Sequence, residues 1–268
     1  MILASIPSPS VNVIEIGPLD IHFYGILIGI GVIVAMVITE RRYLRFGGDP
    51  KDVEKAAFWA VVIGFLGARM AYVSTHLSRF EGRWLHIFAI WEGGLAFFGG
   101  LTGGAIAAIW VMRRRGGNFP AFADAVAIGL PAAQAIGRFG NYFNQELFGT
   151  PTDLPWGLEI APRFRPAEYL DAETFHPTFL YEGLWNRGVI LLLLTIEKRF
   201  RLKRGSILLA YFVAYGVGRF LMELLRTDTT FRVFGISRNG WVSVAIVIGG
   251  SIWLRLRNRI SEEESEVV

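Results

Sequence analysis

Long apolar runs alternate with short clusters of charged residues along the whole chain. Seven of these runs reach or approach the roughly 20 residues that cross the hydrocarbon core of a bilayer. They cover approximately residues 21–39, 56–75, 94–112, 121–136, 180–196, 207–225 and 241–256. The pattern predicts an all-α polytopic membrane protein with about seven transmembrane helices.

One transmembrane domain over residues 1–260 would contain all of these runs. The longest interval between them, at about 139–175, carries several prolines and acidic residues and indicates irregular or partly interfacial structure. Residues 261–268 (SEEESEVV) are polar, and we expect a disordered cytoplasmic tail. No internal repeat is evident, which argues against the inverted repeats of many transporters.

Basic residues are distributed unequally between alternate loops. They gather around 41–55, 113–115, 198–204 and 255–259, whereas the other loops carry fewer. Because Lys and Arg near helix ends are retained on the cytoplasmic side, this predicts an outside N-terminus, a cytoplasmic C-terminus and an external 139–175 loop. The N-terminus lacks the basic region and cleavage site of a signal peptide, so we expect it to be retained.

The composition of the chain narrows the possible chemistry. Hydrophobic residues make up 53% of the 268 residues, and there is no cysteine, which excludes disulfides, thiolate metal sites and a cysteine nucleophile. The four histidines are scattered without metal-binding spacing, so we expect no metal and no cofactor. The net charge of +4 comes from loop clusters rather than a contiguous basic face, and we expect no nucleic-acid partner.

Ionisable residues within the apolar runs indicate a functional site, because an intramembrane arginine costs about 2.5 kcal/mol or more. In the run at 207–225 and directly after it, four polar residues follow at helical spacing on one face: Tyr215, Arg219, Glu223 and Arg226. One interpretation is a structural Arg219–Glu223 pair that holds helices together. The functional interpretation is an anion site facing the outer leaflet.

A second group lies at the outer end of the fourth run, in the sequence GRFGNYFNQELFG at 137–149. Arg138 lies between two glycines, and Asn141, Asn144 and Glu146 place amide and carboxylate groups beside it. The planar guanidinium of arginine binds phosphate through two parallel hydrogen bonds. The alternative is that Arg138 only anchors a helix end at headgroup level.

The sequence HPTFLYE at 176–182 opens the fifth run. His176 is either a proton acceptor near neutral pH or a hydrogen-bonded structural residue. Glu182 lies deeper in the run and needs a partner. Because Arg187 is one position away from ideal i+4 spacing, we expect another helix to supply that partner.

The glycine-rich segment GGLAFFGGLTGG at 93–104 contains two overlapping GxxxG pairs. Small residues at this spacing let two helices approach closely, so helix packing is the favoured interpretation. Space for an acyl chain is the alternative.

The predicted topology brings several of these residues to one leaflet. Tyr24 begins the first run on the outside, and Arg69 lies near the outer end of the second. Arg138, Arg219 and Glu223 lie at the outer ends of their own runs. Arginines at this depth suit the phosphate of a phospholipid, whereas a proton channel needs ionisable groups across the full depth. An organic-anion transporter or channel using the same arginines is the alternative from another class.

With these motifs the sequence resembles the prolipoprotein diacylglyceryl transferases. The signature at 137–149 is the most specific match, and HPTFLYE at 176–182 and YGVGRFLMELLRTD at 215–228 follow in the family's order. Shorter matches are FYG at 23–25, GAR at 67–69 and EGGL at 92–95.

The resemblance implies a seven-helix enzyme of the bacterial inner membrane, with its active site toward the periplasmic, outer leaflet. Its substrates would be phosphatidylglycerol and prolipoprotein signal peptides with a lipobox cysteine. The enzyme would transfer the sn-1,2-diacylglyceryl group to the cysteine thiol, form a thioether and release glycerol phosphate. The nucleophile would belong to the acceptor protein, which fits the absence of cysteine from this chain.

The resemblance also implies roles for individual residues. Arg138 and Arg219 match the two arginines that hold the phosphatidylglycerol headgroup. The other matching positions are Tyr24, Asn141, Glu146, Gly149, Tyr215 and Glu223. The residue patterns add His176 as a catalytic candidate, and Arg69 and Asn144 as candidates for lipid binding.

One position and one segment depart from the family pattern. Some members have a histidine, suggested as a base, where this sequence has Phe98, and a phenyl ring cannot accept a proton. The candidate bases are then Glu146, Glu223 and His176. The segment NGWVS at 239–243 also departs, and we assign it no role. An intramembrane protease is a weaker alternative, because the sequence has no GxSG motif and no matched pair of membrane aspartates.

Overall fold

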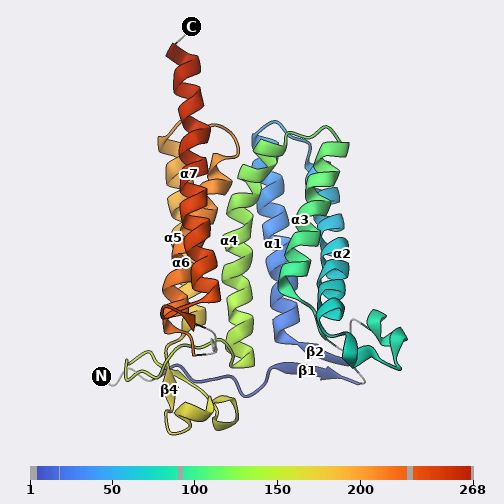
Figure 1. Cartoon of the computed structure of the whole chain (residues 1–268), viewed down its shortest axis with the longest axis vertical. Coiled ribbons are helices and arrows are strands. Elements are labelled where there is room, and N and C mark those ends of the chain that lie inside the picture. The colour runs from blue at the N-terminus through green and yellow to red at the C-terminus, as the bar shows by residue number, and fades with distance from the viewer. Residues whose placement is uncertain (1–4, 18, 90–92, 228–231, 267–268) are drawn as a thin grey trace. The chain divides into compact units, whose positions relative to one another are not determined.

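The computed structural model describes residues 5–17, 19–89, 93–227 and 232–266. Within these residues it contains seven α-helices, one for each of the predicted apolar runs (Figure 1). They are α1 (Phe23–Arg45), α2 (Pro50–Thr75), α3 (Phe97–Arg114), α4 (Phe119–Asn144), α5 (Thr178–Arg199), α6 (Ser206–Leu225) and α7 (Arg238–Glu266). The prediction of an all-α polytopic membrane protein is confirmed.

Six of the helices in the described residues are long and apolar enough to cross a membrane. The exception is α3, which has 18 residues and ends in Arg113 and Arg114. It also begins later than residue 94, because Gly93 and Gly94 have φ angles of 79° and 69° that no right-handed helix contains. The seventh expected span is therefore present as a shorter helix.

Two other predicted boundaries differ from the structure. Helix α4 continues to Asn144 rather than ending near residue 136, so Arg138 and Asn141 are helical and the following loop begins at Gln145 instead of about 139. Glycine and polar residues after residue 136 lower the local hydropathy without breaking the helix. Helix α7 continues to Glu266, into the segment for which the sequence predicts disorder.

The chain forms two compact units, residues 1–37 with 126–268, and residues 38–125. In the second unit α2 and α3 lie side by side (Figure 1). A Cβ added to Gly67 would come within 2.5 Å of the Gly99 carbonyl oxygen, and one added to Gly103 within 2.8 Å of the Ile63 carbonyl oxygen. The GxxxG segment therefore packs backbone against backbone, which confirms the favoured interpretation.

In the first unit α5, α6 and α7 pack together (Figure 1). The indole nitrogen of Trp185 on α5 donates to the Ala214 carbonyl of α6 at 3.1 Å. Gly218 leaves room for the same indole ring, since a Cβ at that position would overlap it. Gly216 likewise lets α6 approach Ser243 and Val247 of α7. These close approaches fix α6, which carries Arg219 and Glu223.

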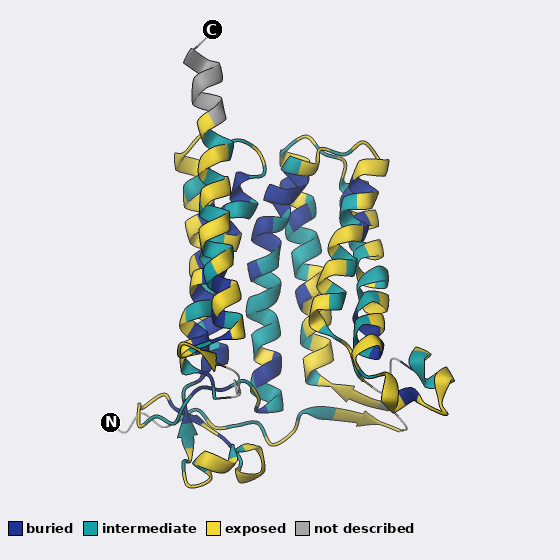
Figure 2. Ribbon diagram, in the orientation of Figure 1, coloured by how far each residue is buried: buried dark blue, intermediate teal, exposed yellow. Residues whose placement is uncertain are grey.

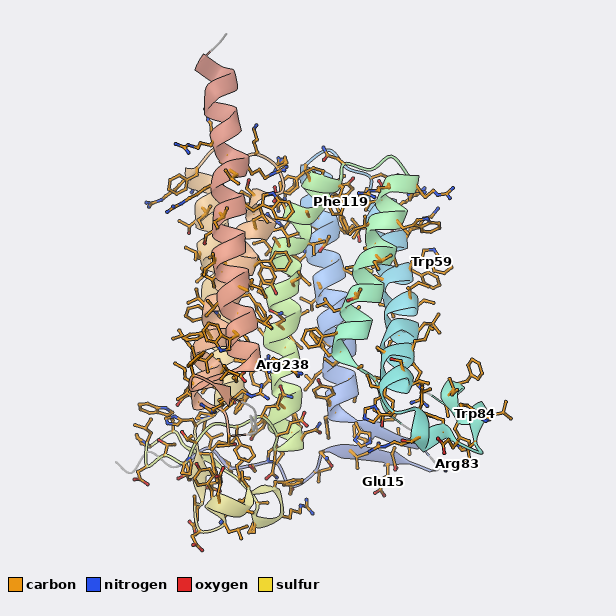
Figure 3. The ribbon with its side chains drawn as sticks, viewed as in Figure 1. Glu15, Trp59, Arg83, Trp84, Phe119 and Arg238 are labelled. Atoms are coloured by element: carbon orange, nitrogen blue, oxygen red, sulfur yellow. The ribbon has the colours of Figure 1, made fainter. Side chains whose placement is uncertain are left out.

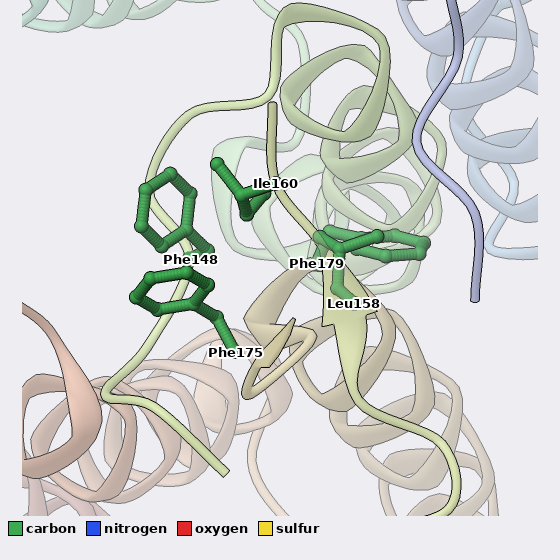
Figure 4. Packing of buried hydrophobic residues seen from close by; sticks show 5 residues of the cluster. All are labelled: Phe148, Leu158, Ile160, Phe175 and Phe179. Carbon is green, nitrogen blue, oxygen red and sulfur yellow. The ribbon is translucent and has the colours of Figure 1, made fainter. Parts of the chain in front are cut away.

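The loop between α4 and α5 has a hydrophobic core formed by its own Phe148, Leu158, Ile160 and Phe175 together with Phe179 of α5 (Figure 4). A short antiparallel pair, β3 (Leu158–Glu159) and β4 (Thr174–Phe175), closes it, with 3-10 turns η4 (Pro162–Phe164) and η5 (Ala167–Tyr169) between. The remaining short elements are β1 (Val13–Ile16), β2 (Leu19–His22), η1 (Leu77–Phe80), η2 (Trp84–Phe88), β5 (Arg232–Val233) and β6 (Ile236–Ser237). The loop is thus an ordered platform beside the end of α4.

Many large apolar side chains on the helices are exposed (Figure 2). Trp59 projects from the outer face of α2 (Figure 3), and Met70 on the same helix and Leu191 on α5 are 71% and 60% exposed. Such surfaces would be unfavourable in water and are suited to contact with lipid chains.

Candidate functional site

The two arginines at 138 and 219 share one carboxylate. Glu182 on α5 lies between them, with its Oε2 atom 2.5 Å from Nη2 of Arg138 on α4 and its Oε1 atom 4.0 Å from Nη1 of Arg219 on α6. All three side chains are largely removed from solvent. The expectation that another helix supplies the partner of Glu182 is confirmed. Two helices supply one partner each, α4 with Arg138 and α6 with Arg219.

Arg219 also forms the predicted pair along its own helix. Its Nη2 atom lies 2.6 Å from Oε2 of Glu223, and the other oxygen of Glu223 accepts a 2.8 Å hydrogen bond from Oγ of Ser237. Ser237 in turn caps α7, because its Oγ accepts from the Gly240 backbone nitrogen at 3.0 Å. The carboxylate of Glu223 is therefore fixed by a guanidinium on one side and a helix cap on the other.

The end of α4 positions the next residues of the site. The backbone nitrogen of Glu146 donates to the Asn141 carbonyl and that of Gln145 to the Tyr142 carbonyl, which is the bonding pattern of a Schellman motif. Gln145, with a φ of 51°, takes the left-handed position that glycine usually occupies. Its side chain compensates by bonding to the Pro9 carbonyl and the Ala161 nitrogen. This reversal directs Glu146 back toward α4.

Asn141 links Glu146 to the arginines. Its Oδ1 atom accepts from Arg138 Nη1 at 3.3 Å, and its Nδ2 atom donates to Glu146 Oε1 at 2.8 Å. Asn144 donates to the same Glu146 oxygen at 3.3 Å. A continuous polar network therefore runs from Glu146 through Arg138 and Glu182 to Glu223.

Tyr24 lies at the edge of this network. Its ring lies against the backbone of Gly140, where an added Cβ would overlap it. The phenol is near enough to Arg138 and Glu146 to interact with both electrostatically. The structure thus brings together Tyr24 with the predicted residues of α4 and α6.

Two other predicted residues, Gly149 and Tyr215, lie in the same unit without a described bond to Arg138 or Arg219. Gly149 pairs with Arg226 across a β-bridge, and its backbone nitrogen donates to the His176 carbonyl at 2.9 Å. Tyr215 stacks on Tyr211, with ring centroids 5.9 Å apart, one helical turn before Arg219. Gly149 therefore joins the loop to the end of α6.

His176 belongs to a hydrogen-bonded trio. Its Nδ1 atom lies 3.1 Å from the Tyr181 hydroxyl, and that hydroxyl accepts from the Trp156 indole nitrogen at 3.0 Å. Since the indole nitrogen can only donate, the phenolic proton is available for His176 Nδ1. This geometry supports the structural interpretation of His176.

Arg69, a predicted lipid-binding residue, makes its described hydrogen bonds to backbone carbonyls. In the second unit its guanidinium is buried and donates to the backbone carbonyls of His86, Ile87, Gly93 and Gly94. It thereby anchors the segment that carries Arg83 and Trp84 (Figure 3). Phe98 is the second residue of α3 in the same unit, and it is 64% exposed. These bonds show Arg69 organising a loop, and its predicted part in lipid binding stays a prediction.

Glu182 and Ser237 are the site residues that the candidate set from the sequence lacks. Glu182 could have been included because it is a carboxylate within an apolar run. The sequence spacing between Glu182 and Arg187 did not reveal that its partners are Arg138 and Arg219. Ser237 gave no signal, because its role depends on α7 beginning beside α6. Within the described residues no group of three or more His, Asp or Glu side chains is arranged to hold a metal ion.

The chain is similar to known proteins over nearly its whole length. The sequence matches the family model for prolipoprotein diacylglyceryl transferase over residues 11–256. It is 45% identical over 252 residues to phosphatidylglycerol–prolipoprotein diacylglyceryl transferase 2 of Streptomyces coelicolor, covering 93% of this chain and 80% of that protein. It is 44% identical over 252 residues to the phosphatidylglycerol–prolipoprotein diacylglyceryl transferase of Cutibacterium acnes, covering 92% and 84%.

Proposed function

The chain belongs to the prolipoprotein diacylglyceryl transferase family, and from this premise we propose its reaction and the residues that carry it. The enzyme is a transferase that acts on phosphatidylglycerol and a prolipoprotein. It moves the sn-1,2-diacylglyceryl group of the lipid to the thiol of the lipobox cysteine. The names of these relatives give no support to an organic-anion transporter.

The observation that carries the assignment of the site is the pair of guanidinium groups, Arg138 on α4 and Arg219 on α6, on either side of one carboxylate, that of Glu182. In the reaction, the bond between the glyceryl carbon and the phosphate oxygen breaks as a sulfur–carbon bond forms. The electron pair of the broken bond stays on the phosphate oxygen, and glycerol phosphate leaves. Arg138 and Arg219 stabilise the negative charge that develops there, because fixed donors in a dry site need no reorganisation.

The proton of the substrate thiol must go to a base. Glu223 is 3% exposed and its oxygens are engaged by Arg219 and Ser237, and His176 belongs to the trio with Tyr181. Glu146 is exposed and accepts from two neutral amides, so a substrate thiol can reach it. We therefore assign the proton to Glu146, and a thiol with a pKa of about 8.5 needs only modest assistance.

The setting of the reaction follows from the same family and from the distribution of charge. The protein is a multi-pass membrane protein, and we assign it to the bacterial inner membrane with its site toward the outer leaflet. The acceptor is a signal peptide with a lipobox cysteine. That peptide must supply the thiol, because this chain has no cysteine.

The experiment uses membranes that contain the protein, supplied with phosphatidylglycerol and a lipobox peptide. The product is a diacylglyceryl thioether, detected as the mass increase of the peptide. We expect Arg138→Ala and Arg219→Ala each to lower its rate at least about a hundredfold, as for loss of an oxyanion-type donor. Arg199→Ala, at the far end of α5, is the control and should retain the wild-type rate. Normal turnover by both site variants would overturn the assignment of the phosphate to these arginines.

A further inference from the structure

The carboxylate of Glu182 occupies the position between the two arginines that a bound phosphate would need. It reaches Arg138 with one oxygen and faces Arg219 with the other. The two non-bridging oxygens of a phosphodiester have the same arrangement, because they also project from one central atom and share a single negative charge. Glu182 and the lipid phosphate are therefore competitors for one place.

The formal charges show that both anions cannot remain there together. Arg138 and Arg219 are balanced by Glu182 and Glu223, and Glu146 adds a further negative charge through Asn141. A phosphodiester would add another negative charge to a site whose carboxylates at 182 and 223 are 7% and 3% exposed. Uncompensated charge in such surroundings is costly, so one carboxylate has to give way.

Of the two buried carboxylates, Glu182 is the one held less firmly. Glu223 is bound at 2.6 Å by Arg219, one turn away on its own helix, and also by the hydroxyl of Ser237. Among the described residues, the partners of the Glu182 carboxylate are the two arginines alone, Arg138 at 2.5 Å and Arg219 at 4.0 Å, and no hydroxyl or amide holds it in addition. The interactions that hold Glu182 are thus those that the lipid phosphate would take over.

We propose that Glu182 is an internal anion that holds Arg138 and Arg219 together when no lipid is bound, and that the phosphodiester of phosphatidylglycerol displaces it. The inference rests on the proposed function, because it takes the lipid from it. The exchange replaces one negative charge by another, so the arginines stay paired before and after binding. Glu182 also returns as a competitor when the product leaves, which favours release of glycerol phosphate.

The exchange predicts an unusual direction for the effect of Glu182→Gln. Removing a competing charge should tighten the binding of phosphatidylglycerol, whereas loss of a residue that merely positions the arginines should weaken it. We expect the KM for phosphatidylglycerol, and its Kd measured with labelled lipid in detergent, to fall at least about fivefold. A change in affinity of about fivefold is the lower end of the range typical when two binding equilibria are coupled. Glu197→Gln is the matched control, since it neutralises another α5 carboxylate that pairs with an arginine, Arg204. It should change neither value.

A second variant tests the same position by chemical substitution. In Glu182→Ala, added formate should fill the space between the arginines and inhibit competitively with phosphatidylglycerol, but it should not do so in the wild-type protein. A raised or unchanged Kd in Glu182→Gln, or no competition by formate in Glu182→Ala, would overturn the exchange. Failure of both variants to fold in membranes containing phosphatidylglycerol would also overturn it, because the lipid phosphate should replace the missing carboxylate.

The binding measurements separate this inference from the proposed function. If the wild-type protein forms no thioether, the proposed function fails while the lipid affinities still test the exchange. If thioether forms normally and Glu182→Gln binds the lipid more weakly, the exchange alone fails. Displacement of the labelled lipid by inorganic phosphate at equal concentration would assign the position to a free anion instead of a lipid headgroup.

Discussion

Asn141 shows how one neutral side chain can connect groups of opposite charge. Its carbonyl oxygen accepts from Arg138 while its amide nitrogen donates to Glu146, and the side chain is almost fully buried. An aspartate offers only acceptors when ionised, and a buried apolar residue offers neither group. The position therefore requires an amide, and the bridge keeps Glu146 beside the arginine without a direct ion pair.

Asn141→Asp should disrupt this bridge although it changes the side-chain volume very little. The new carboxylate places an acceptor against the acceptor of Glu146, and loss of a hydrogen bond to a charged group costs about 1.5–3 kcal/mol. We expect kcat/KM for thioether formation to fall about ten- to a hundredfold. Asn144→Asp makes the same change beside the same carboxylate over a longer bond of 3.3 Å, and its effect should be smaller. Equal effects of the two substitutions would show that Asn141 is not a bridge.

The sequence was most informative about single residues where it places a charged side chain in an apolar run, because burying such a charge costs free energy. Arg138, Arg219 and Glu223 stood out as charges in apolar runs, and the structure brings them into one network. Arg69 gave the same signal, and in the structure four backbone carbonyls satisfy its buried guanidinium, which they can do as well as an anion can. The free-energy cost of burying a charge indicates that the charged side chain has partners. Only the fold shows which residues those partners are.

At the scale of elements, the packing of α2 on α3 depends on glycines. Gly67 and Gly99 each approach the carbonyl oxygen of the other so closely that a Cβ would overlap it. Backbone atoms of two packed helices cannot move aside independently, so a methyl group at either position must separate the helices. The GxxxG spacing predicted this interface from sequence because the contact repeats every four residues along both helices.

Gly67→Ala should therefore lower stability, although alanine is the better helix former in water. We expect a loss of about 1–3 kcal/mol, as for other overpacked interiors, measured as a lower Tm in detergent micelles. Gly188→Ala is the matched control, since no described atom lies within 4 Å of the Cβ that it would add on α5. Its Tm should stay the same or rise slightly. A Tm for Gly67→Ala equal to that of the control would show that the two helices do not pack as described.

Helix ends were predicted less well than helix positions. The apolar run that identified α4 stops near residue 136, but hydropathy does not report backbone hydrogen bonding, and the helix continues for two more turns. It ends at Asn144, and the left-handed conformation of the next residue, Gln145, is supported by two hydrogen bonds of its side chain. The side chain donates to the Pro9 carbonyl and accepts from the Ala161 nitrogen, both distant in the sequence. No local signal marks such an end, because its stability comes from tertiary contacts.

At the scale of the molecule, the site and the basic clusters of the first unit lie at opposite ends of its helices. Arg138 is near the end of α4, Glu182 near the start of α5 and Arg219 near the end of α6. Lys198 and Arg199, in contrast, end α5. If Lys and Arg mark the cytoplasmic side, the site faces the outer leaflet, where the proposed reaction takes place.

This orientation can be tested directly because the chain has no cysteine and therefore no background labelling. Single cysteines at exposed positions are treated with a membrane-impermeant maleimide in spheroplasts of a bacterial host. We expect labelling of Ser78→Cys and Asp153→Cys in intact spheroplasts, because the loops that carry them are poor in basic residues. Glu54→Cys and Arg201→Cys lie among the basic clusters and should react only after the membrane is permeabilised. The reverse pattern would place Arg138 and Arg219 at the cytoplasmic leaflet and would exclude transfer to a thiol on the outer side.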